Sequence, residues 1–192
     1  MSKENALRRI AILGAESTGK STLADALARR YGTLWVPEYL REFVDTEQRV
    51  PFEGDQPGIA GTQLAREDAL ARDPRVRDFL FCDTTPLMTA VYSRIYWGRV
   101  PAGLLALEAA HDYALTVVAA PDLPWVPDGL MRDSDEVRQR VHAQLLAVLQ
   151  ARGIGYVVVE GELAQRVARV EALLGDLSAP ITRRSRESGN PC

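Results

Sequence analysis

Five short apolar runs divide the chain and predict the strands of a buried sheet. They lie at residues 9–13, 33–36, 79–82, 115–118 and 156–159. Short apolar runs bounded by turn residues are typical of strands that are buried on both faces. Between the runs, apolar residues recur at helical spacing, as Leu23, Leu27 and Tyr31 do over residues 20–31. This alternation predicts an α/β fold with a five-stranded parallel sheet covered by helices on both faces.

Turn residues mark the connections between these elements. Residues 50–58 are rich in proline and glycine and predict a loop, as do residues 121–133. Further helices are expected at 59–72, 86–97, 101–113 and 162–174, and one more that starts at Asp133, which resembles the N-cap of a capping box with Glu136. No linker or repeat divides the chain, so we predict a single domain over residues 1–175 and a disordered tail over 176–192.

Composition and charge narrow the possible function classes. The chain has 192 residues, 46% of them hydrophobic, and a net charge of −3. A chain of this length can bury a full core without disulfides. The charge provides no general basic field for nucleic acid or an anionic membrane. The N-terminus lacks the apolar stretch of a signal peptide, and no run approaches the roughly 20 apolar residues of a membrane span. We therefore expect a cytoplasmic protein that binds neither nucleic acid nor a membrane.

The strongest chemical signal is a glycine-rich segment between the first strand and the first helix. Gly14-x-x-x-x-Gly19-Lys20-Ser21 satisfies the P-loop pattern, in which backbone N–H groups and a lysine hold nucleotide phosphates. A glycine turn that binds nothing is the alternative, and the flanking strand and helix disfavour it. We expect ATP at this loop, with Mg²⁺ on the hydroxyl of Ser21. The expected nucleotide-binding residues are Gly14, Ala15, Glu16, Ser17, Thr18, Gly19, Lys20, Ser21 and Thr22.

Two carboxylates follow predicted strands at the edge where open α/β sheets bind ligands. Asp83 follows the third strand and is placed to hold Mg²⁺, or alternatively to cap the next helix. Glu38 follows the second strand and could accept a proton from an attacking hydroxyl or anchor ribose hydroxyls. The alternative for Glu38 is a solvated residue at a helix start.

Several motifs together resemble ribosylnicotinamide kinases. The P-loop, Pro-Glu-Tyr-Leu-Arg-Glu at 37–42, Cys-Asp-Thr at 82–84, the Thr89/Tyr92 spacing and Pro-Asp-Leu-Pro-Trp-Val-Pro-Asp-Gly at 121–129 occur in the same order in that family. These motifs resemble the C-terminal kinase domain of NadR-type regulators of NAD synthesis. The resemblance covers about residues 8–175. The P-loop is shared with many nucleotide-binding proteins, whereas the motifs at 37–42 and 121–129 are much more specific.

The resemblance implies transfer of the ATP γ-phosphate to the 5′-hydroxyl of nicotinamide riboside, giving nicotinamide mononucleotide. It implies the P-loop NTPase fold of nucleoside and nucleotide kinases, a three-layer α/β/α sandwich. Glu38 and Asp83 fall in the acceptor and metal region, and Asp128, Arg132 and Arg138 fall in or after a mobile lid over residues 121–138. Because the resemblance begins near residue 8, we expect a stand-alone kinase without the other NadR functions.

A cationic nicotinamide ring suits an aromatic face or nearby carboxylates. The aromatic candidates are Tyr39, Tyr92, Trp97 and Trp125, each of which could instead pack in the core. The substrate-binding residues expected are Glu38, Tyr39, Arg41, Asp83, Thr84, Tyr92, Trp97, Trp125 and Asp128. The catalytic residues expected are Lys20, Glu38, Asp83, Arg132 and Arg138, although both arginines could simply solvate a surface helix. Ser21 and Asp83 are the expected metal ligands.

Three alternatives to this function stay open. The first is a kinase of the same fold that acts on another nucleoside or small hydroxyl acceptor. The second is a regulatory GTPase, which the lack of an Asn-Lys-x-Asp guanine-reading segment disfavours. The third is a non-catalytic ATP-binding module, which the intact Lys20, Ser21 and Asp83 disfavour. The sequence leaves the oligomeric state open.

Overall fold

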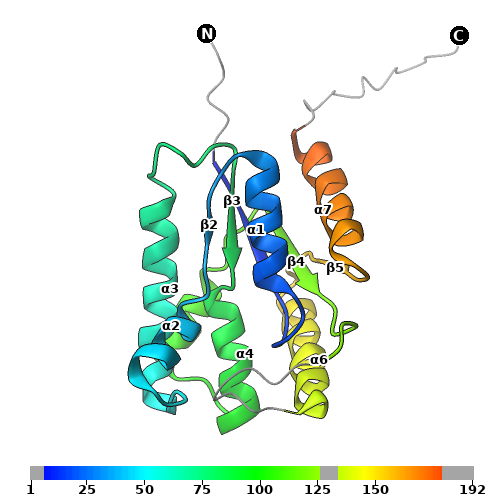
Figure 1. Cartoon of the computed structure of the whole chain (residues 1–192). Helices are drawn as coiled ribbons and strands as arrows, with labels where there is room; N and C mark the ends of the chain where they lie inside the picture. Colours follow the sequence, from blue (N-terminus) through cyan, green and yellow to red (C-terminus); the bar gives the residue numbers. More distant parts are fainter. Residues whose placement is uncertain (1–6, 126–133, 179–192) are drawn as a thin grey trace, which may run out of the picture.

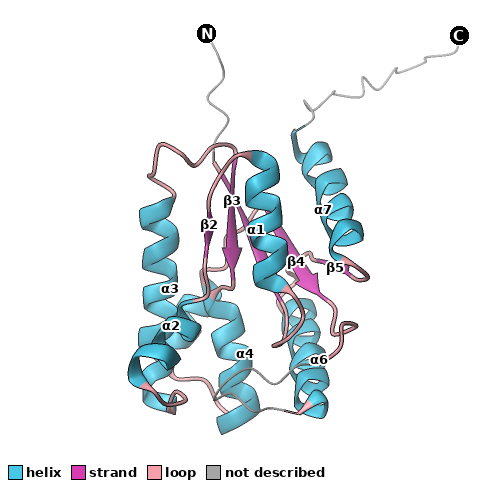
Figure 2. Cartoon of the chain, viewed as in Figure 1, coloured by secondary structure: helices cyan, strands magenta, loops and turns pink. Residues whose placement is uncertain are grey.

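A parallel sheet of five strands forms the centre of the molecule. The computed structural model describes residues 7–125 and 134–178 (Figures 1 and 2). The strands are ordered β2-β3-β1-β4-β5, and every neighbouring pair is parallel. Their bounds are β1 Arg8–Leu13, β2 Trp35–Val36, β3 Phe79–Asp83, β4 Leu115–Ala119 and β5 Val157–Val159. The predicted fold class is thereby confirmed.

Helices connect the strands and cover both faces of the sheet. They are α1 Lys20–Tyr31, α2 Tyr39–Glu47, α3 Gln56–Leu70, α4 Pro86–Trp97, α5 Ala102–Ala109, α6 Asp135–Ala151 and α7 Leu163–Ser178, and a short 3-10 helix occupies Glu53–Asp55. Within the described ranges, none of these helices has both the length and the apolar character that a membrane crossing requires.

The side-chain alternation of β1 shows how the layers form. Ile10 and Ile12 point into a core made with α1 and α7. Ala11 and Leu13 point the other way, into a core made with α4 and α6. All four are fully buried, and burying an isoleucine or leucine side chain contributes about 1.5–3 kcal/mol. The sheet is therefore held from both sides, and the carboxyl ends of its strands meet at one edge, at the bottom of Figure 1.

Several element boundaries differ from those expected from the sequence. Helix α2 is absent from the expected helices and was weighed only as the alternative of a helix start at Glu38, and α3 begins at Gln56, inside the predicted 50–58 loop. Pro57 lies in the first turn of α3, where a missing N–H is tolerated, so a proline that reads as a loop signal instead begins a helix. The N-cap of α6 is Ser134 rather than Asp133, since the Ser134 hydroxyl accepts from the Val137 N–H. Helix α7 continues to Ser178, past the expected start of the tail.

A buried carboxyl lies between α3 and the sheet. Glu67 is fully buried on α3 and accepts a hydrogen bond from the Tyr113 hydroxyl at 2.7 Å. The Arg9 guanidinium lies 3.8 Å away. Burial raises the pKa of Glu67 to about 7, against the lowering effect of the Tyr113 hydrogen bond and the Arg9 charge. The protonated form therefore persists in the folded protein at pH values where an exposed glutamate is ionised.

This raised pKa predicts a loss of stability as pH rises. Between about pH 4.5 and pH 7 the folded state holds a proton at Glu67 that the unfolded chain has released, so the free energy of unfolding should fall across this interval. Glutamine is a neutral mimic of protonated glutamate, so in Glu67→Gln the free energy of unfolding should fall less steeply as pH rises. Urea denaturation at a series of pH values measures it. Burial also raises the pKa of Asp83 to about 6, so Asp83 contributes to the same fall in the free energy of unfolding. The variant Asp83→Asn measures the contribution of Asp83 separately. The prediction would be contradicted if the free energy of unfolding changed with pH equally steeply in Glu67→Gln and in the unaltered protein.

Candidate active site

The glycine-rich loop bends tightly between β1 and α1. Gly14 has φ of +150° and Gly19 has φ of +78°, both in the region that favours glycine. A Cβ on Gly14 would lie 2.8 Å from Thr18 Oγ1 and 2.9 Å from the Ala119 carbonyl oxygen. The Thr18 hydroxyl donates to the Ala15 carbonyl at 2.8 Å and closes the bend. The backbone geometry thus requires glycine and fits the predicted P-loop.

The residues that follow the bend bring a cation and a hydroxyl to the same edge. Lys20 is buried, and its Nζ donates to the Ala15 carbonyl at 2.7 Å. Ser21 Oγ donates to Asp83 Oδ2 at 2.5 Å, which joins the loop to the end of β3. Glu16 is also buried, whereas Ser17 is half-buried and Thr22 is exposed in the first turn of α1.

Asp83 is fully buried at the carboxyl end of β3. Burial raises the pKa of Asp83 to about 6, and the nearby Glu38 charge adds to the rise, while the Lys20 charge and the Ser21 hydrogen bond oppose it. Its second oxygen, Oδ1, has no hydrogen-bond partner among the described residues. Mg²⁺ prefers oxygen ligands, and this point offers the Ser21 hydroxyl and one carboxylate, Asp83, whose second oxygen is unpartnered among the described residues. Ser21 and Asp83 therefore fit a magnesium ion.

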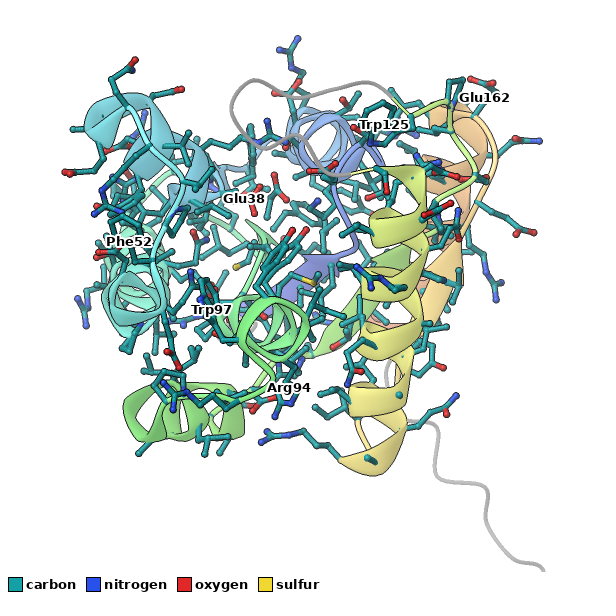
Figure 3. All side chains as sticks on the ribbon, turned by 90° about the horizontal axis from the view of Figure 1, so that it is seen from below. Glu38, Phe52, Arg94, Trp97, Trp125 and Glu162 are labelled. Carbon is teal, nitrogen blue, oxygen red and sulfur yellow. The ribbon has the colours of Figure 1, made fainter. Side chains whose placement is uncertain are left out.

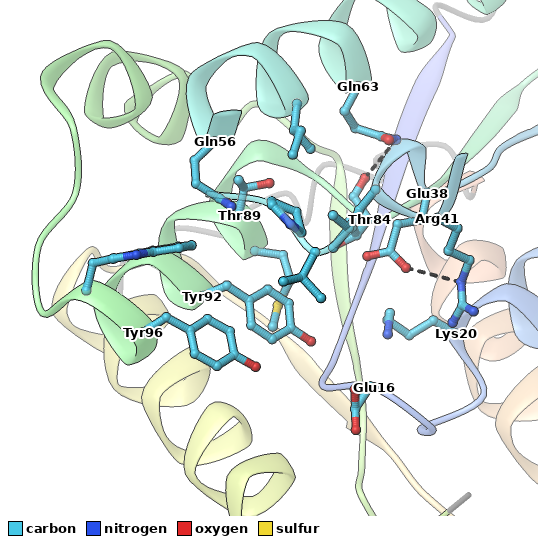
Figure 4. Close-up of a pocket in the computed structure, with 16 residues that line it drawn as sticks. Glu16, Lys20, Glu38, Arg41, Gln56, Gln63, Thr84, Thr89, Tyr92 and Tyr96 are labelled. Atoms are coloured by element: carbon cyan, nitrogen blue, oxygen red, sulfur yellow. Dashed lines mark hydrogen bonds and ion pairs between the residues drawn. The ribbon is translucent and has the colours of Figure 1, made fainter. Parts of the chain in front are cut away.

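Glu38 and Arg41 come from the start of α2. Glu38 is the N-cap residue of this helix, yet its side chain makes no capping hydrogen bond. It lies 3.4 Å from Arg41 as an ion pair instead (Figure 4). Glu38 is nearly buried, while Arg41 is exposed. The alternative of a freely solvated glutamate at the helix start does not match this burial.

A cavity of about 440 Å³ opens beside the P-loop, between α2, α3 and α4. This volume is in the range of small-molecule sites. Its lining combines P-loop and α2 charges with apolar and aromatic side chains from α3 and α4. The lining residues are Glu16, Lys20, Glu38, Leu40, Arg41, Val50, Pro51, Gln56, Ile59, Gln63, Thr84, Met88, Thr89, Tyr92, Tyr96 and Trp97.

The aromatic wall of the cavity comes from one face of α4. The rings of Tyr92 and Tyr96 stack with centroids 6.0 Å apart, and Tyr96 meets Trp97 edge-on at 5.8 Å. Tyr92 and Trp97 were expected at the site from the sequence, whereas Tyr96 was not. Its position four residues after Tyr92 on a helix is the signal that could have identified it.

Two other aromatic candidates lie elsewhere. The ring of Tyr39 packs under the Arg66 guanidinium at 4.5 Å, and Tyr39 is not among the residues that line the cavity. Trp125 lies at the P-loop, where its indole N–H donates to Glu16 Oε1 at 3.2 Å. Figure 3 shows Trp125 well apart from Trp97 in the view onto this edge. The structure thus places neither ring in the cavity wall.

Of the expected lid residues, the structure describes Arg138. It is only 4% exposed, so it does not simply solvate the surface of α6. Its guanidinium donates to the Leu123 carbonyl at 2.9 Å and to the Ser17 carbonyl in the P-loop at 3.4 Å. Asp128 and Arg132 lie outside the described residues.

Arg166 on α7 is a site residue that the sequence analysis missed. It is 2% exposed and donates to the P-loop carbonyl of Thr18 and to the carbonyl of Gly161, each at 2.7 Å. It also pairs with Asp122, whose carboxylate accepts from the Gly161 N–H. One guanidinium therefore connects the P-loop with the loops that follow β4 and β5. No local motif marks Arg166, because two of its partners, Thr18 and Asp122, are distant in the sequence.

The cavity also contains two glutamines that the sequence analysis missed. Gln63 accepts from the Tyr39 N–H at 2.8 Å and donates to the Thr84 carbonyl at 3.4 Å. Gln56 is buried at the start of α3. Thr84, which was expected at the site, is buried and lines the cavity. The glutamines lay in or beyond the predicted 50–58 loop, and only the folded position of α3 brings them to the cavity.

Solved structures share the fold of this chain. A crystal structure of NadR protein in complex with NR has a TM-score of 0.77 and 22% sequence identity, over 94% of this chain and 54% of that chain. A second, of NadR protein in complex with NAD and AMP-PNP, has a TM-score of 0.73 and 22% identity, over 94% of this chain and 52% of that chain. These likenesses confirm the expected P-loop kinase fold.

Sequence comparison agrees with the fold. The trifunctional NAD biosynthesis/regulator protein NadR of Escherichia coli (strain K12) is 31% identical over 163 residues, which are 81% of this chain and 39% of that protein. The chain thus spans about two-fifths of the length of this curated relative. The family of proteins described as AAA domain matches residues 9–166, most of the chain. The NadR resemblance drawn from the motifs is confirmed, and the chain belongs to the AAA domain family.

Proposed function

We propose that this protein is a kinase that transfers the γ-phosphate of ATP to the 5′-hydroxyl of nicotinamide riboside. The observation that carries the proposal is the continuity of the cavity. The same 440 Å³ space is lined by the P-loop ammonium of Lys20, the carboxylate of Glu38 and the aromatic wall of α4. A nucleoside in this space would bring its hydroxyl to the phosphate donor and its ring to the aromatic side chains.

The names of similar proteins support the reaction. The E. coli relative is an NAD biosynthesis protein, and the NadR crystal structures contain NR in one case and AMP-PNP, an ATP analogue, in the other. A kinase that converts nicotinamide riboside to the mononucleotide uses both kinds of ligand. We assign this reaction to residues 1–175 as one kinase domain, acting in the cytoplasm where ATP and Mg²⁺ are available.

The phosphate donor is assigned to the P-loop. Its backbone N–H groups and the N-terminus of α1 would surround the phosphates, and Lys20 would bring positive charge to the β- and γ-phosphates. Mg²⁺ held by Ser21 and Asp83 would neutralise charge on the phosphate oxygens. The Arg138 guanidinium, which contacts the Ser17 carbonyl, would add a second cation beside the loop and belongs to the proposed lid over residues 121–138.

The acceptor is assigned to the cavity. Glu38 lines the cavity, whereas Asp83 is bonded to Ser21 and is not among the lining residues. We therefore assign Glu38 to hold the acceptor hydroxyl and receive its proton, and Asp83 to the metal. The cationic ring of nicotinamide riboside would lie against Tyr92, Tyr96 and Trp97, since aromatic faces attract cations.

The direct test is product identity. Purified protein would be incubated with Mg·ATP and nicotinamide riboside, and the products separated by chromatography. We expect nicotinamide mononucleotide and ADP in equal amounts. A parallel panel of other nucleosides tests the acceptor. Turnover of another nucleoside without turnover of nicotinamide riboside would overturn the substrate assignment and leave the kinase assignment standing.

Lys20→Ala should abolish most activity without unfolding the protein. The substitution removes the cation assigned to the transferred phosphate, so turnover should fall by about 10²–10³-fold, as for loss of one preorganised electrostatic group. Steady-state kinetics measure the loss, and thermal denaturation checks the fold. Arg29→Ala, an exposed change on the same helix, is the control and should retain activity. Near-normal turnover by Lys20→Ala would exclude the loop as the phosphate site.

Arg166→Lys should raise KM for ATP more than KM for the acceptor. Lysine keeps the charge but cannot reach the Thr18 carbonyl, the Gly161 carbonyl and Asp122 together, since it lacks the planar fork of arginine. We expect KM for ATP to rise about tenfold, as for loss of one charged hydrogen bond. KM for nicotinamide riboside should change little. Arg169→Lys, exposed on the same helix, is the matched control. Equal effects on both KM values would contradict a role specific to the P-loop.

A further inference from the structure

The end of the cavity away from the P-loop contains an unpartnered amide. Gln56 is 5% exposed and lines the cavity. Within residues 7–125 and 134–178 its side chain makes no hydrogen bond. Gln63, on the same helix, contrasts with it, because both ends of the Gln63 amide are bonded within the protein. Gln63 therefore supports the wall of the cavity, whereas the amide of Gln56 is available to a ligand.

The cavity has two chemically different ends (Figure 4). Lys20, Glu38 and Arg41 lie at one end. Gln56 and Thr89 lie at the other, with Tyr92 and Tyr96 beside the open space. An acceptor that presents its hydroxyl to Glu38 and Lys20 must therefore extend its ring toward Gln56. This orientation brings any polar substituent on the ring to the amide.

The chemistry of that substituent follows from the glutamine. A primary amide offers one oxygen acceptor and two N–H donors. A second primary amide complements it with two hydrogen bonds, one in each direction. A carboxylate has only acceptors, so it can use the donors of glutamine but leaves the glutamine oxygen without a partner. Leaving a buried polar group unpaired is unfavourable, and a site built to bond a substrate group discriminates against analogues that lack it.

We propose that Gln56 is a specificity-determining residue that pairs with a carboxamide on the ring of the acceptor, with the hydroxyl of Thr89 beside it. This assignment rests on the proposed function, because the acceptor is taken to be nicotinamide riboside. In addition, the Gln56 amide would bind the carboxamide of the acceptor and would discriminate against an analogue with a carboxylate at that position.

The experiment compares two acceptors that differ at one group. Nicotinamide riboside carries a carboxamide, and nicotinic acid riboside carries a carboxylate at the same ring position. For each enzyme variant, kcat/KM is measured with both acceptors at saturating Mg·ATP. The readout is the ratio of the two values, because a general loss of packing lowers both and leaves the ratio unchanged.

Three variants separate the roles. Gln56→Leu removes both halves of the amide, so kcat/KM for the carboxamide acceptor should fall about 10- to 100-fold and the preference should shrink toward unity. Gln56→Glu keeps the size of the side chain and adds a negative charge, so the carboxylate acceptor should be rejected more strongly than by the unaltered enzyme. Gln63→Leu is the matched control: it breaks internal hydrogen bonds, so it should lower thermal stability without changing the ratio.

The outcomes distinguish this inference from the proposed function. An unaltered enzyme that prefers the carboxamide, with a ratio that falls in Gln56→Leu and rises in Gln56→Glu, supports the assignment. An active enzyme whose ratio is the same in all variants overturns the role of Gln56 and leaves the proposed function intact. An enzyme that phosphorylates neither riboside overturns the proposed function, and the role of Gln56 falls with it.

Discussion

The close approach of the P-loop to the end of β4 constrains the rest of the site. At Gly14 there is no room for a side chain between Thr18 and the Ala119 carbonyl. The loop is therefore pressed against the sheet, and its position is set by backbone rather than by flexible side chains. Ser21 then meets Asp83 on the neighbouring strand β3, and Arg166 reaches the Thr18 carbonyl from α7. A displacement of the loop would break contacts with two strands and a helix at once.

The parts of the site that the sequence predicts are those encoded by contiguous residues. The P-loop is one segment whose glycines, lysine and serine act through local geometry. Asp83 was predictable because it directly follows a buried strand, and carboxyl ends of parallel strands share one edge. Glu38 was predictable for the same reason, because it lies just after β2. The five strands were predicted because their apolar runs are short and bounded by turns.

The parts that the sequence does not predict depend on long-range packing. Arg166 is separated from Thr18 by most of the chain, and nothing near it in sequence marks a buried arginine. Gln56 looked like part of a loop, because proline and glycine beside it are turn signals that a helix N-terminus also tolerates. Tyr39 was expected at the acceptor site from a shared motif, yet α2 turns its ring against Arg66. A motif identifies a segment, while the direction of each side chain follows from the packing of its helix.

The aromatic wall depends in turn on a partly buried ion pair behind it. Glu108 on α5 is fully buried and accepts two hydrogen bonds from Arg94 on α4, both at 2.9 Å. Arg152, which follows α6, lies 3.2 Å from the same carboxylate. Buried ion pairs add little net stability, because desolvation offsets their attraction. A two-point contact does restrict rotation of α4, however, and α4 carries Thr89, Tyr92, Tyr96 and Trp97 into the cavity. Glu108 therefore helps to set the direction of the wall against which the acceptor ring would lie, without touching the acceptor itself.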